Sequence, residues 1–483
     1  MNVTEWVFFI IYLVFMLGVG IFFFLRSKNA GEKDFFLGGR QMGAWVSALS
    51  AGASDMSAWV LMGLPASIYA MGMGQTWIAI GLIIGYALSW IFEAPRLRRF
   101  SIAADDSITI PQYLTKRFLS RSKALQIICA VIFLFAYTIY AASSIKACGT
   151  LFNTVMGIDA GMAMYIAAAI IIGYTFLGGF SAVCWTDFFQ GLLMLAALLV
   201  APIFALAMVK QGCAVQAELP ENFWNFTADW RDIVSGLGWG LGYFGMPHII
   251  IRFMSIRSEK EVRKSAVIGI TWTFIILTFS VIAGAVGRVL LGQIENSSIV
   301  FITMVRRIFP VAISGILLSA ILAAAMSTAD SQLLASASSF SSDVYKPIFR
   351  KNASDKEMLW VSRIVVAVIA VVALIIAADP GSGTIMNLVE NAWGVFGAAF
   401  GPAILLSLFW RRFTFSGAIA GIVAGAGVDI LWLAFLKAST GIYEIIPGFV
   451  ISFAAAVIVS LLSPEPTEEV KALFNKASTS TEI

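Results

Sequence analysis

Charged side chains are scarce in this chain. They make up 12% of the 483 residues, whereas hydrophobic residues make up 59%, and a typical soluble domain carries about 25% charged residues. A water-soluble globule of this size cannot bury so much apolar surface, which argues against a soluble enzyme and favours a lipid bilayer as the solvent. The net charge of +4 gives no indication of a nucleic-acid partner.

Histidine and cysteine are also rare. The one histidine, His248, excludes zinc sites built on several histidines. The cysteines Cys129, Cys148, Cys184 and Cys213 are far apart, and three of them lie in apolar runs, which is typical of buried thiols rather than a disulfide framework. With no metal triad and no nucleophile beside a base, we expect no enzymatic activity.

Long apolar runs, by contrast, follow one another along the chain. A hydrocarbon core of about 30 Å requires roughly 20 apolar residues per helix. The sequence therefore predicts an all-α integral membrane protein with about thirteen transmembrane helices. They lie near 5–25, 43–72, 76–93, 125–151, 160–178, 183–208, 233–254, 265–291, 311–341, 358–378, 384–409, 416–436 and 444–463. The first is too long for a signal peptide, and the tail after Pro464 is short and polar, so we expect it to be mobile.

Lysine and arginine concentrate in alternate loops. The richer set comprises Arg26, Lys28, Lys33, Arg40, Arg96, Arg98, Arg99, Lys116, Arg117, Arg121, Lys123, Arg252, Arg257, Lys260, Arg263, Lys264, Lys346, Arg350, Lys351, Lys356, Arg411, Arg412, Lys471 and Lys476. Because cytoplasmic loops carry the excess of these residues, the alternation predicts an N-terminus outside the cell and a C-terminus in the cytoplasm.

Two of the predicted spans are poor candidates for continuous helices. The second contains SALSAGASDMSAW (47–59), with Asp55 at mid-membrane, and the seventh contains SGLGWGLGYFGMPH (235–248). Glycine weakens a helix and proline removes a backbone donor. Unpaired backbone is tolerated in a membrane only where it faces protein or a wet cavity. The alternative is close helix packing through small residues.

The two breaks lie five spans apart, which is typical of an inverted-repeat transporter. The pattern divides the chain into a first helix and loop (1–42), a first repeat of spans two to six (43–210), a second repeat of spans seven to eleven (211–410), two peripheral helices (411–463) and a cytoplasmic tail (464–483). In such folds half-helix N-termini face an anionic group of the substrate, and freed carbonyls coordinate a cation.

A third polar cluster lies in span nine, AILAAAMSTADSQLLASASS (320–339), where Ser327, Thr328, Asp330 and Ser331 interrupt an Ala/Leu helix. A single helix serine usually bonds back to its own helix. A dense group of oxygen-bearing side chains is better explained by a hard cation, which prefers oxygen ligands.

Over nearly its whole length the chain resembles the solute:sodium symporters. The resemblance is carried by FFLGGR (35–40), SALSAGASDMSAWVLMGLP (47–65), FLGGFSAVCWTD (176–187), GWGLGYFGMPHIIIRFM (238–254), LLSAILAAAMST (317–328), FGAAFGP (396–402) and YEIIPGF (443–449). It implies a five-plus-five inverted-repeat core of the leucine-transporter type in a bacterial inner membrane. It also implies sodium-coupled import of a small zwitterionic solute by alternating access, with L-proline as the expected solute.

The resemblance also implies site residues. Sodium would be held by carbonyls of Ala53, Met56 and Ala324 and by hydroxyls of Ser327 and Thr328. Asp55 would matter for sodium coupling, or alternatively would cap the broken half-helix.

The solute would contact Ser57, Tyr140, Trp239, Tyr243 and Pro247. The spacing of the last three predicts one shared helix face, and aromatic faces suit a pyrrolidine ring. The substrate carboxylate would sit at a half-helix N-terminus, while ordinary packing is the alternative for the two aromatic residues.

Two departures leave the solute open. Ala58 stands where proline-transporting members of the family have glycine, and Met246 where they have glutamine. Pantothenate, a monocarboxylate, a sugar or sialic acid are the alternative solutes, and a transporter-like sensor is a further alternative that the lack of a signalling domain disfavours.

Two pairs of charged residues within spans are candidates for a functional role. Asp187 and Asp330, with Ser331, form either a second cation or proton site or a structural pair sharing a proton. Lys146 and Glu390 have matching depths, so we expect either an ion pair that closes the outer vestibule or two solvated charges.

Two arginines lie at the inner ends of spans. We expect Arg40 and Arg252 to be positive-inside anchors. The resemblance also gives Arg40 a place in an inner gate network.

Overall fold

The computed structural model describes residues 3–26, 32–175, 179–215, 219–227 and 229–479, which form helices joined by short loops and contain no β-strand. Lys28 and residues 176–178 of the FLGGFSAVCWTD stretch lie outside the described residues. The α-helices are α1 (Val3–Arg26), α2 (Glu32–Leu37), α3 (Ala44–Asp55), α4 (Gly63–Met71), α5 (Thr76–Leu88), α6 (Ala94–Ala103), α7 (Ile110–Arg117), α8 (Ala124–Met156), α9 (Ala160–Thr175), α10 (Phe180–Lys210), α11 (Trp230–Gly238), α12 (Pro247–Ser255), α13 (Glu259–Leu291), α14 (Val300–Ile308), α15 (Val311–Ser338), α16 (Asp355–Ala378), α17 (Ile385–Phe409), α18 (Phe415–Phe435), α19 (Lys437–Thr440), α20 (Ile445–Leu462) and α21 (Glu468–Thr479).

Short 3-10 and π segments interrupt or extend these helices. The 3-10 segments are η1 (Gly38–Arg40), η2 (Ala58–Val60), η3 (Met73–Gln75), η5 (Trp239–Phe244), η6 (Ser297–Ile299) and η8 (Pro380–Ser382), and the π segments are η4 (Ser89–Glu93) and η7 (Ser339–Phe349).

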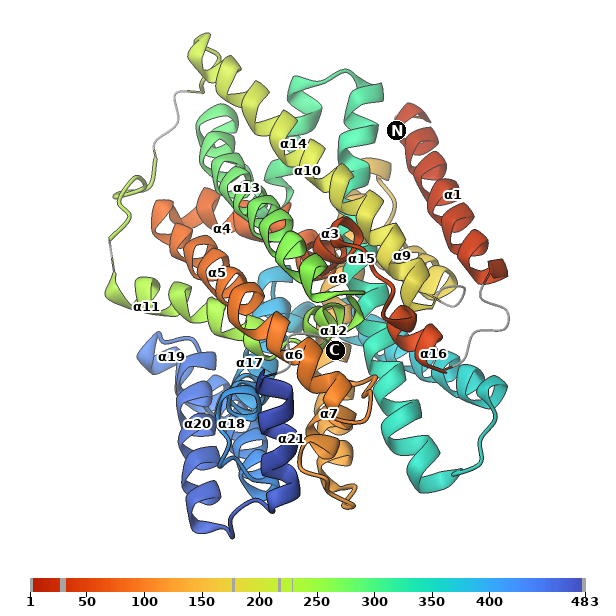
Figure 1. Ribbon diagram of the computed structural model, residues 1–483. Coiled ribbons are helices and arrows are strands. Elements are labelled where there is room, and N and C mark those ends of the chain that lie inside the picture. Colours follow the sequence, from red (N-terminus) through yellow and green to blue (C-terminus); the bar gives the residue numbers. More distant parts are fainter. Residues whose placement is uncertain (1–2, 27–31, 176–178, 216–218, 228, 480–483) are drawn as a thin grey trace.

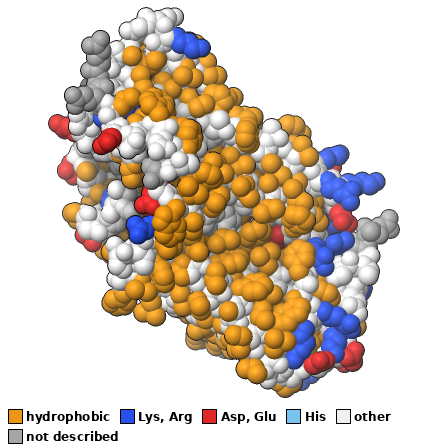
Figure 2. Space-filling model, turned by 90° about the vertical axis from the view of Figure 1, so that its left-hand side faces the viewer, with side chains coloured by type: hydrophobic (Ala, Val, Ile, Leu, Met, Phe, Trp, Pro, Cys, Tyr) orange, Lys and Arg blue, Asp and Glu red, His pale blue; other side chains and the backbone are white. Residues whose placement is uncertain are grey.

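Each predicted span coincides with helical structure. Among the described residues, ten helices are long and apolar enough to cross a membrane. The other three predicted spans correspond to the 16-residue α9 and to the two broken segments, α3–α4 and α11–α12. The chain is therefore a multi-pass membrane protein, while a count of about thirteen spans stays a prediction. Figure 2 shows hydrophobic side chains covering the middle of one face, with Lys and Arg gathered toward one edge.

The two broken segments lie at the centre of the molecule. In Figure 1, α3, α8, α12 and α15 occupy the middle, while α1 lies at one edge and α18 and α20 at the opposite edge. The α15 helix is buried from Ser314 almost without interruption to Ser338, as expected of a helix surrounded by protein rather than lipid. The polar cluster of span nine is thus carried into the interior.

The first break follows Asp55, the last residue of α3. Met56 leaves the helical region with φ −81° and ψ 76°, and Ser57 is extended. The Ser57 hydroxyl accepts a hydrogen bond from the Trp59 N–H at 3.4 Å, so this side chain caps η2. A polar side chain that supplies a cap replaces the bonds lost where the helix is interrupted.

The second break separates η5 from α12 at Gly245 and Met246. A Cβ atom on Gly245 would lie 2.4 Å from the Phe396 carbonyl oxygen, so only glycine lets α17 pack this closely. Pro247 then begins α12, where its missing N–H costs no helical bond. Because Trp239 and Tyr243 lie on η5, no continuous α-helical face joins them to Pro247, and the predicted shared face is wrong.

Loops predicted to share a side of the membrane contact one another. At one end Glu5 pairs with Arg306, with 2.6 Å between the carboxylate and the guanidinium. At the other end Arg40 pairs with Asp106 at 2.8 Å. We name the end that carries Arg40 the inner end and the end that carries Arg306 the outer end. Each of these two ion pairs joins segments that the sequence places on one side of the membrane, whereas the orientation itself stays a prediction.

The described part of the C-terminal tail, up to residue 479, contains a packed helix, so the prediction of a mobile tail is wrong for that part. Residues 468–479 form α21, whose Val470, Phe474 and Ala477 are buried. The Phe474 ring packs edge-on against Phe100 at 5.3 Å, and the Arg117 guanidinium lies 5.0 Å from the Phe474 ring centre. The spacing of these three residues is an amphipathic helical pattern that a reading of the tail as simply polar overlooks.

Candidate functional site

The hydroxyl cluster of α15 faces the break in α3. Ser327 Oγ donates a hydrogen bond to the Ala53 carbonyl at 2.7 Å and lies 3.1 Å from the Ala324 carbonyl. Thr328 Oγ1 lies 3.4 Å from the same Ala53 oxygen. All four residues are fully buried. The structure therefore brings together four of the five residues expected to bind sodium.

The fifth, Met56, follows the last residue of α3 as its C-cap and is also fully buried, with its N–H bonded to the Gly52 carbonyl at 2.9 Å. Carbonyls at a helix C-terminus carry partial negative charge, which favours a cation. The donor set consists of carbonyl and hydroxyl oxygens, the ligands of a hard cation. Sodium binding by these residues stays a prediction that this arrangement fits.

Asp55 is the residue on which the neighbouring groups converge. The Tyr243 hydroxyl donates to its carboxylate Oδ2, while the Tyr140 hydroxyl and the Trp59 indole N–H reach its backbone carbonyl at 3.1 and 3.2 Å. The other carboxylate oxygen has no hydrogen-bond partner among the described residues. Since Ser57 supplies the cap of η2, the alternative role of Asp55 as a helix cap is wrong.

An aromatic cluster surrounds this carboxylate. The Tyr243 ring lies 5.0 Å from that of Tyr86 and 5.1 Å from that of Trp393, edge-on in both cases. Trp239 lies 5.2 Å from Tyr443 and 6.4 Å from Trp59. Edge-on and offset ring pairs of this kind are favourable.

Two tryptophans of this cluster were not among the predicted residues. Trp59 lies within the SALSAGASDMSAWVLMGLP stretch, so that motif contained a signal for it. The Trp393 indole N–H donates to the Trp239 carbonyl at 2.8 Å. No local pattern singles out Trp393, because an isolated aromatic in an apolar helix has no distinctive spacing.

The first backbone donors of α12 are already occupied. Pro247 has no N–H, the His248 N–H donates to the Tyr137 hydroxyl at 2.9 Å, and the Ile249 N–H returns to the Met246 carbonyl at 3.1 Å. His248 is fully buried and packed against Tyr137, as expected of a structural histidine. The start of α12 is therefore poorly suited to bind the carboxylate of a substrate. In the first break, by contrast, the Ala58 N–H has no hydrogen-bond acceptor among the described residues and is available to a carboxylate.

A cavity of about 340 Å³ reaches this region from the outer end, and its lining includes Trp239, Ser298, Asn387 and Glu390. At the inner end, Arg40 links several loops. The Arg40 guanidinium bonds to Asp106, Ser101 and the Ser107 carbonyl and also reaches the Met254 carbonyl at the end of α12. Arg40 is thus a buried link between inner loops rather than a simple surface anchor.

The Asp106 carboxyl belongs to that inner network. Partial burial acts to raise the pKa of Asp106, but hydrogen bonds and charges from Lys33 and Arg40 outweigh this effect and lower the pKa below its ordinary value. The carboxylate is therefore held in its charged form at neutral pH.

Arg252 is not a surface anchor, and that prediction is wrong. Its guanidinium lies 3.1 Å from Asp187 Oδ2 and donates to Ser331 Oγ at 2.6 Å and to Ser50 Oγ at 3.1 Å. Ser50 in turn donates to the Asp187 carboxylate at 2.7 Å. The segment around Arg252 is covered by α2, α3, α6 and α15, which a reading of single spans could not anticipate.

Asp330 lies beside this network and interacts electrostatically with Asp187 and Arg252. Its two carboxylate oxygens have no hydrogen-bond partner among the described residues. Asp187, Asp330 and Ser331 thus lie close together, as expected, and the Arg252 guanidinium lies among them. A second cation or proton site at these residues stays a prediction.

Lys146 and Glu390 have different partners, so the predicted ion pair between them is wrong. Lys146 Nζ donates to Ser382 Oγ at 3.0 Å and to the Gly383 carbonyl. Glu390 pairs instead with Lys437 Nζ at 3.0 Å, and that lysine also lies 2.9 Å from Glu444. Lys146 thus bonds to the loop before α17 and not to Glu390 on that helix. A role for either residue in an outer gate stays a prediction.

The buried thiols agree with expectation, since Cys129, Cys148 and Cys184 are buried and Cys213 is exposed.

Comparisons with known proteins converge on one family. The model of the sodium:solute symporter family matches residues 35–425. The osmoregulated proline transporter OpuE of Bacillus subtilis (strain 168) is 42% identical over 476 residues, which cover 96% of each chain. The sodium/proline symporter of Escherichia coli (strain K12) is 41% identical over 487 residues, covering 97% of this chain and 95% of that protein.

Solved structures share the fold. A Na⁺-coupled sialic acid symporter in a substrate-bound, outward-open state has a TM-score of 0.78 at 21% identity, covering 96% of this chain and 99% of the other. A nucleobase-cation-symport-1 family transporter in a closed conformation has a TM-score of 0.57 at 16% identity, covering 92% and 99%. The fold is accordingly that of the leucine-transporter type, as expected from the sequence.

Proposed function

Because the chain belongs to the sodium:solute symporter family, we propose that it is a sodium-coupled secondary transporter that imports L-proline by alternating access. Relatives at about 40% identity over nearly the full chain are named proline transporters or sodium/proline symporters, which supports proline as the solute. The same membership favours a transporter over an enzyme.

The observation that carries the proposal is the contact between α15 and the break in α3. The hydroxyls of Ser327 and Thr328 lie 2.7 and 3.4 Å from the Ala53 carbonyl oxygen. Ala53 precedes Asp55 and Ser57 by only two and four residues in the chain. A sodium ion held by these oxygens would fix the end of α3. It would thereby position Asp55 and Ser57 for the solute, which couples the two binding events.

The solute groups find matching chemistry on both sides of the break. The Ser57 hydroxyl and the free Ala58 N–H can donate to the proline carboxylate. The faces of Trp239 and Tyr243 suit the pyrrolidine ring and its positive nitrogen. Tyr140 holds the backbone of Asp55 from the opposite side.

The same arrangement supports the proposed inward direction of transport. The cavity that includes Trp239 approaches from the outer end, and the Arg40 network links loops at the inner end. We assign the outer end to the cell exterior, with the N-terminus outside and the C-terminus in the cytoplasm of a bacterial inner membrane. Residues 43–210 and 211–410 are assigned to the two inverted repeats.

One sodium ion per solute is energetically sufficient for concentration. Moving one charge is worth about 2.3 kcal/mol per 100 mV, whereas a tenfold solute gradient costs about 1.4 kcal/mol. The membrane potential alone therefore sustains accumulation by more than an order of magnitude.

The test is uptake of labelled proline into liposomes containing the purified protein, under an inward sodium gradient, a potassium gradient or none. We expect uptake only with sodium, with competition by unlabelled proline and not by pantothenate, sugars or sialic acid. Ser319→Ala is a matched control for Ser327→Ala, because Ser319 lies on the same buried helix and, among the described residues, its hydroxyl bonds only to the Gly315 carbonyl of that helix at 2.8 Å.

Other results would redirect the proposal. Sodium-dependent uptake of another solute would contradict proline and direct attention to Ala58 and Met246, which are both fully buried at the two breaks. Uptake driven equally by a proton gradient would contradict sodium coupling and direct attention to Asp187 and Asp330.

A further inference from the structure

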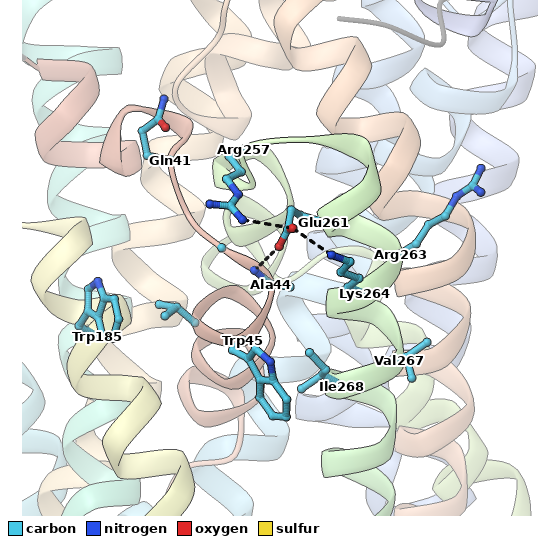
Figure 3. Close-up of a pocket in the computed structure, with 12 residues that line it drawn as sticks. Gln41, Ala44, Trp45, Trp185, Arg257, Glu261, Arg263, Lys264, Val267 and Ile268 are labelled. Atoms are coloured by element: carbon cyan, nitrogen blue, oxygen red, sulfur yellow. Dashed lines mark hydrogen bonds and ion pairs between the residues drawn. The ribbon is translucent and has the colours of Figure 1, made fainter.

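A large cavity lies on the flank of the molecule, away from the solute site. It has a volume of about 890 Å³ and lies between the start of α3, the start of α10 and the first turns of α13. Figure 3 shows its lining, with Trp45 contributed by α3, Trp185 by α10 and Glu261, Lys264 and Ile268 by α13. It is separate from the ion and solute residues, of which it contains none.

The polar and apolar groups of this cavity are segregated. In Figure 3 the side chains of Gln41, Arg257 and Glu261 lie at its upper end, and those of Trp45, Val267 and Ile268 lie below. The upper end coincides with the inner end of the protein, where Lys and Arg predominate. A long molecule with a polar head and an apolar body would match this order of groups.

The polar end has more positive than negative charge. Glu261 accepts from Arg257 at 3.2 Å and from Lys264 at 3.5 Å, and its other oxygen accepts from the Ala44 N–H at 2.9 Å. The Glu261 carboxylate thus accepts hydrogen bonds from two cationic side chains and one backbone N–H, and one negative charge faces two positive charges. The side chains of Arg257 and Lys264 remain 56% and 68% exposed. Because a guanidinium has five N–H donors and an ammonium three, both retain free donors for an anion.

The apolar end is open rather than filled by protein. The side chains of Trp45 and Val267 are 62% and 68% exposed, and Trp185 is 37% exposed. Tryptophan at the boundary between an apolar and a polar region is typical of a membrane interface. Further exposed apolar side chains follow on the same helices, Phe274 on α13 and Leu192 on α10, so hydrocarbon chains rather than water would cover this wall in a membrane.

We propose that this cavity binds one anionic phospholipid, with its phosphate between Arg257 and Lys264 and an acyl chain against Trp45, Trp185 and Ile268. Charge complementarity selects an anionic headgroup, and the apolar wall selects a lipid over a free anion. The occupant would join the start of α3 to α13. The segments just before these helices are already joined by the Arg257 N–H, which donates to the Met42 carbonyl at 3.1 Å.

The experiment measures lipid retention on the purified full chain by native mass spectrometry. Phosphatidylglycerol and phosphatidylcholine with identical acyl chains are compared on the unmodified protein and on Arg257→Gln/Lys264→Gln. We expect preference for phosphatidylglycerol and about a thirtyfold loss of its affinity in the double variant, since each cation near the surface contributes roughly fivefold. The single variants, each with about a fivefold loss, replace the double variant if it does not fold.

The matched control is Lys260→Gln/Lys356→Gln, which removes two exposed charges that do not line the cavity. An equal loss of phosphatidylglycerol in this control, or equal retention of the two lipids, would overturn the proposal.

A second experiment replaces Trp45 with alanine and, separately, titrates the unmodified protein with inorganic phosphate. We expect Trp45→Ala to weaken phosphatidylglycerol and phosphate alone to give no thermal stabilisation. Stabilisation by phosphate equal to that by the lipid would identify a free-anion site and contradict lipid binding.

Discussion

Arg252 and Asp187 form an ion pair in the interior of the protein, with 3.1 Å between Nη2 and Oδ2. The two side chains are 2% and 0% exposed, so both charges have left water. A buried pair of this kind persists only when further hydrogen bonds satisfy it, and here Ser50 and Ser331 supply them. The pair joins α10 to α12, and therefore ties the first predicted repeat to the second.

We expect Arg252→Gln to destabilise the protein by about 3–5 kcal/mol, because it leaves the Asp187 charge buried without its partner. Thermal unfolding in one detergent measures the effect. Arg252→Gln/Asp187→Asn should recover much of the loss, since both charges are then gone. Losses that simply add in the double variant would contradict the coupling.

Ser327→Ala should raise the sodium concentration for half-maximal uptake by about tenfold, corresponding to about 1.4 kcal/mol. The substitution removes one oxygen facing the Ala53 carbonyl and places alanine, a strong helix former, in α15. Sodium titration of proline uptake gives the measurement. The Ser319→Ala control should leave the titration unchanged, and an equal shift in both variants would argue against a sodium ligand.

Tyr243→Phe keeps the ring but removes the hydrogen bond to the Asp55 carboxylate. An acceptor left unsatisfied in the interior costs about 1–3 kcal/mol, so proline uptake should fall while the protein remains folded. Tyr86→Phe is the control, because its ring contacts Tyr243 at 5.0 Å but its hydroxyl makes no hydrogen bond to Asp55. If both variants transport normally, the Tyr243 hydroxyl has no role in the site.

Lys437→Met should destabilise the protein more than Lys146→Met. Lys437 lies within 3.0 Å of Glu390 and 2.9 Å of the fully buried Glu444, so its removal leaves two carboxylates facing each other. Lys146 has neutral partners in Ser382 and Gly383. Thermal unfolding of the two variants gives the comparison. Rescue of transport by exchanging Lys146 and Glu390 would instead support an ion pair between these two residues.

The inner network predicts a dependence of stability on acid pH. Since the folded-state pKa of Asp106 lies below its ordinary value, its contribution is fully present above the unfolded pKa of about 4. That contribution is lost as the pH falls through the lower, folded-state pKa. Asp106→Asn should therefore melt below the unmodified protein at pH 7, and the difference should shrink under acid conditions. A difference that is constant with pH would exclude this carboxylate as its source.

The sequence by itself determined the membrane class, the approximate spans and the two helix breaks. These depend on properties carried within one segment: the length of an apolar run, and the loss of backbone bonds at glycine and proline. It also indicated the hydroxyl cluster of α15, because burying several polar side chains in one membrane helix costs free energy unless they are paired or bind a ligand.

Only the tertiary structure decided which charges meet. Lys146 faces Ser382 and not Glu390, and Arg252 faces Asp187 and not the cytoplasm. Such pairings depend on distances between segments far apart in the chain, which depth along a helix does not specify. The packing of α21 on α6, and of Trp393 on Trp239, has the same origin. Each arises because an apolar face or a buried donor takes the partner that the folded helices bring within reach.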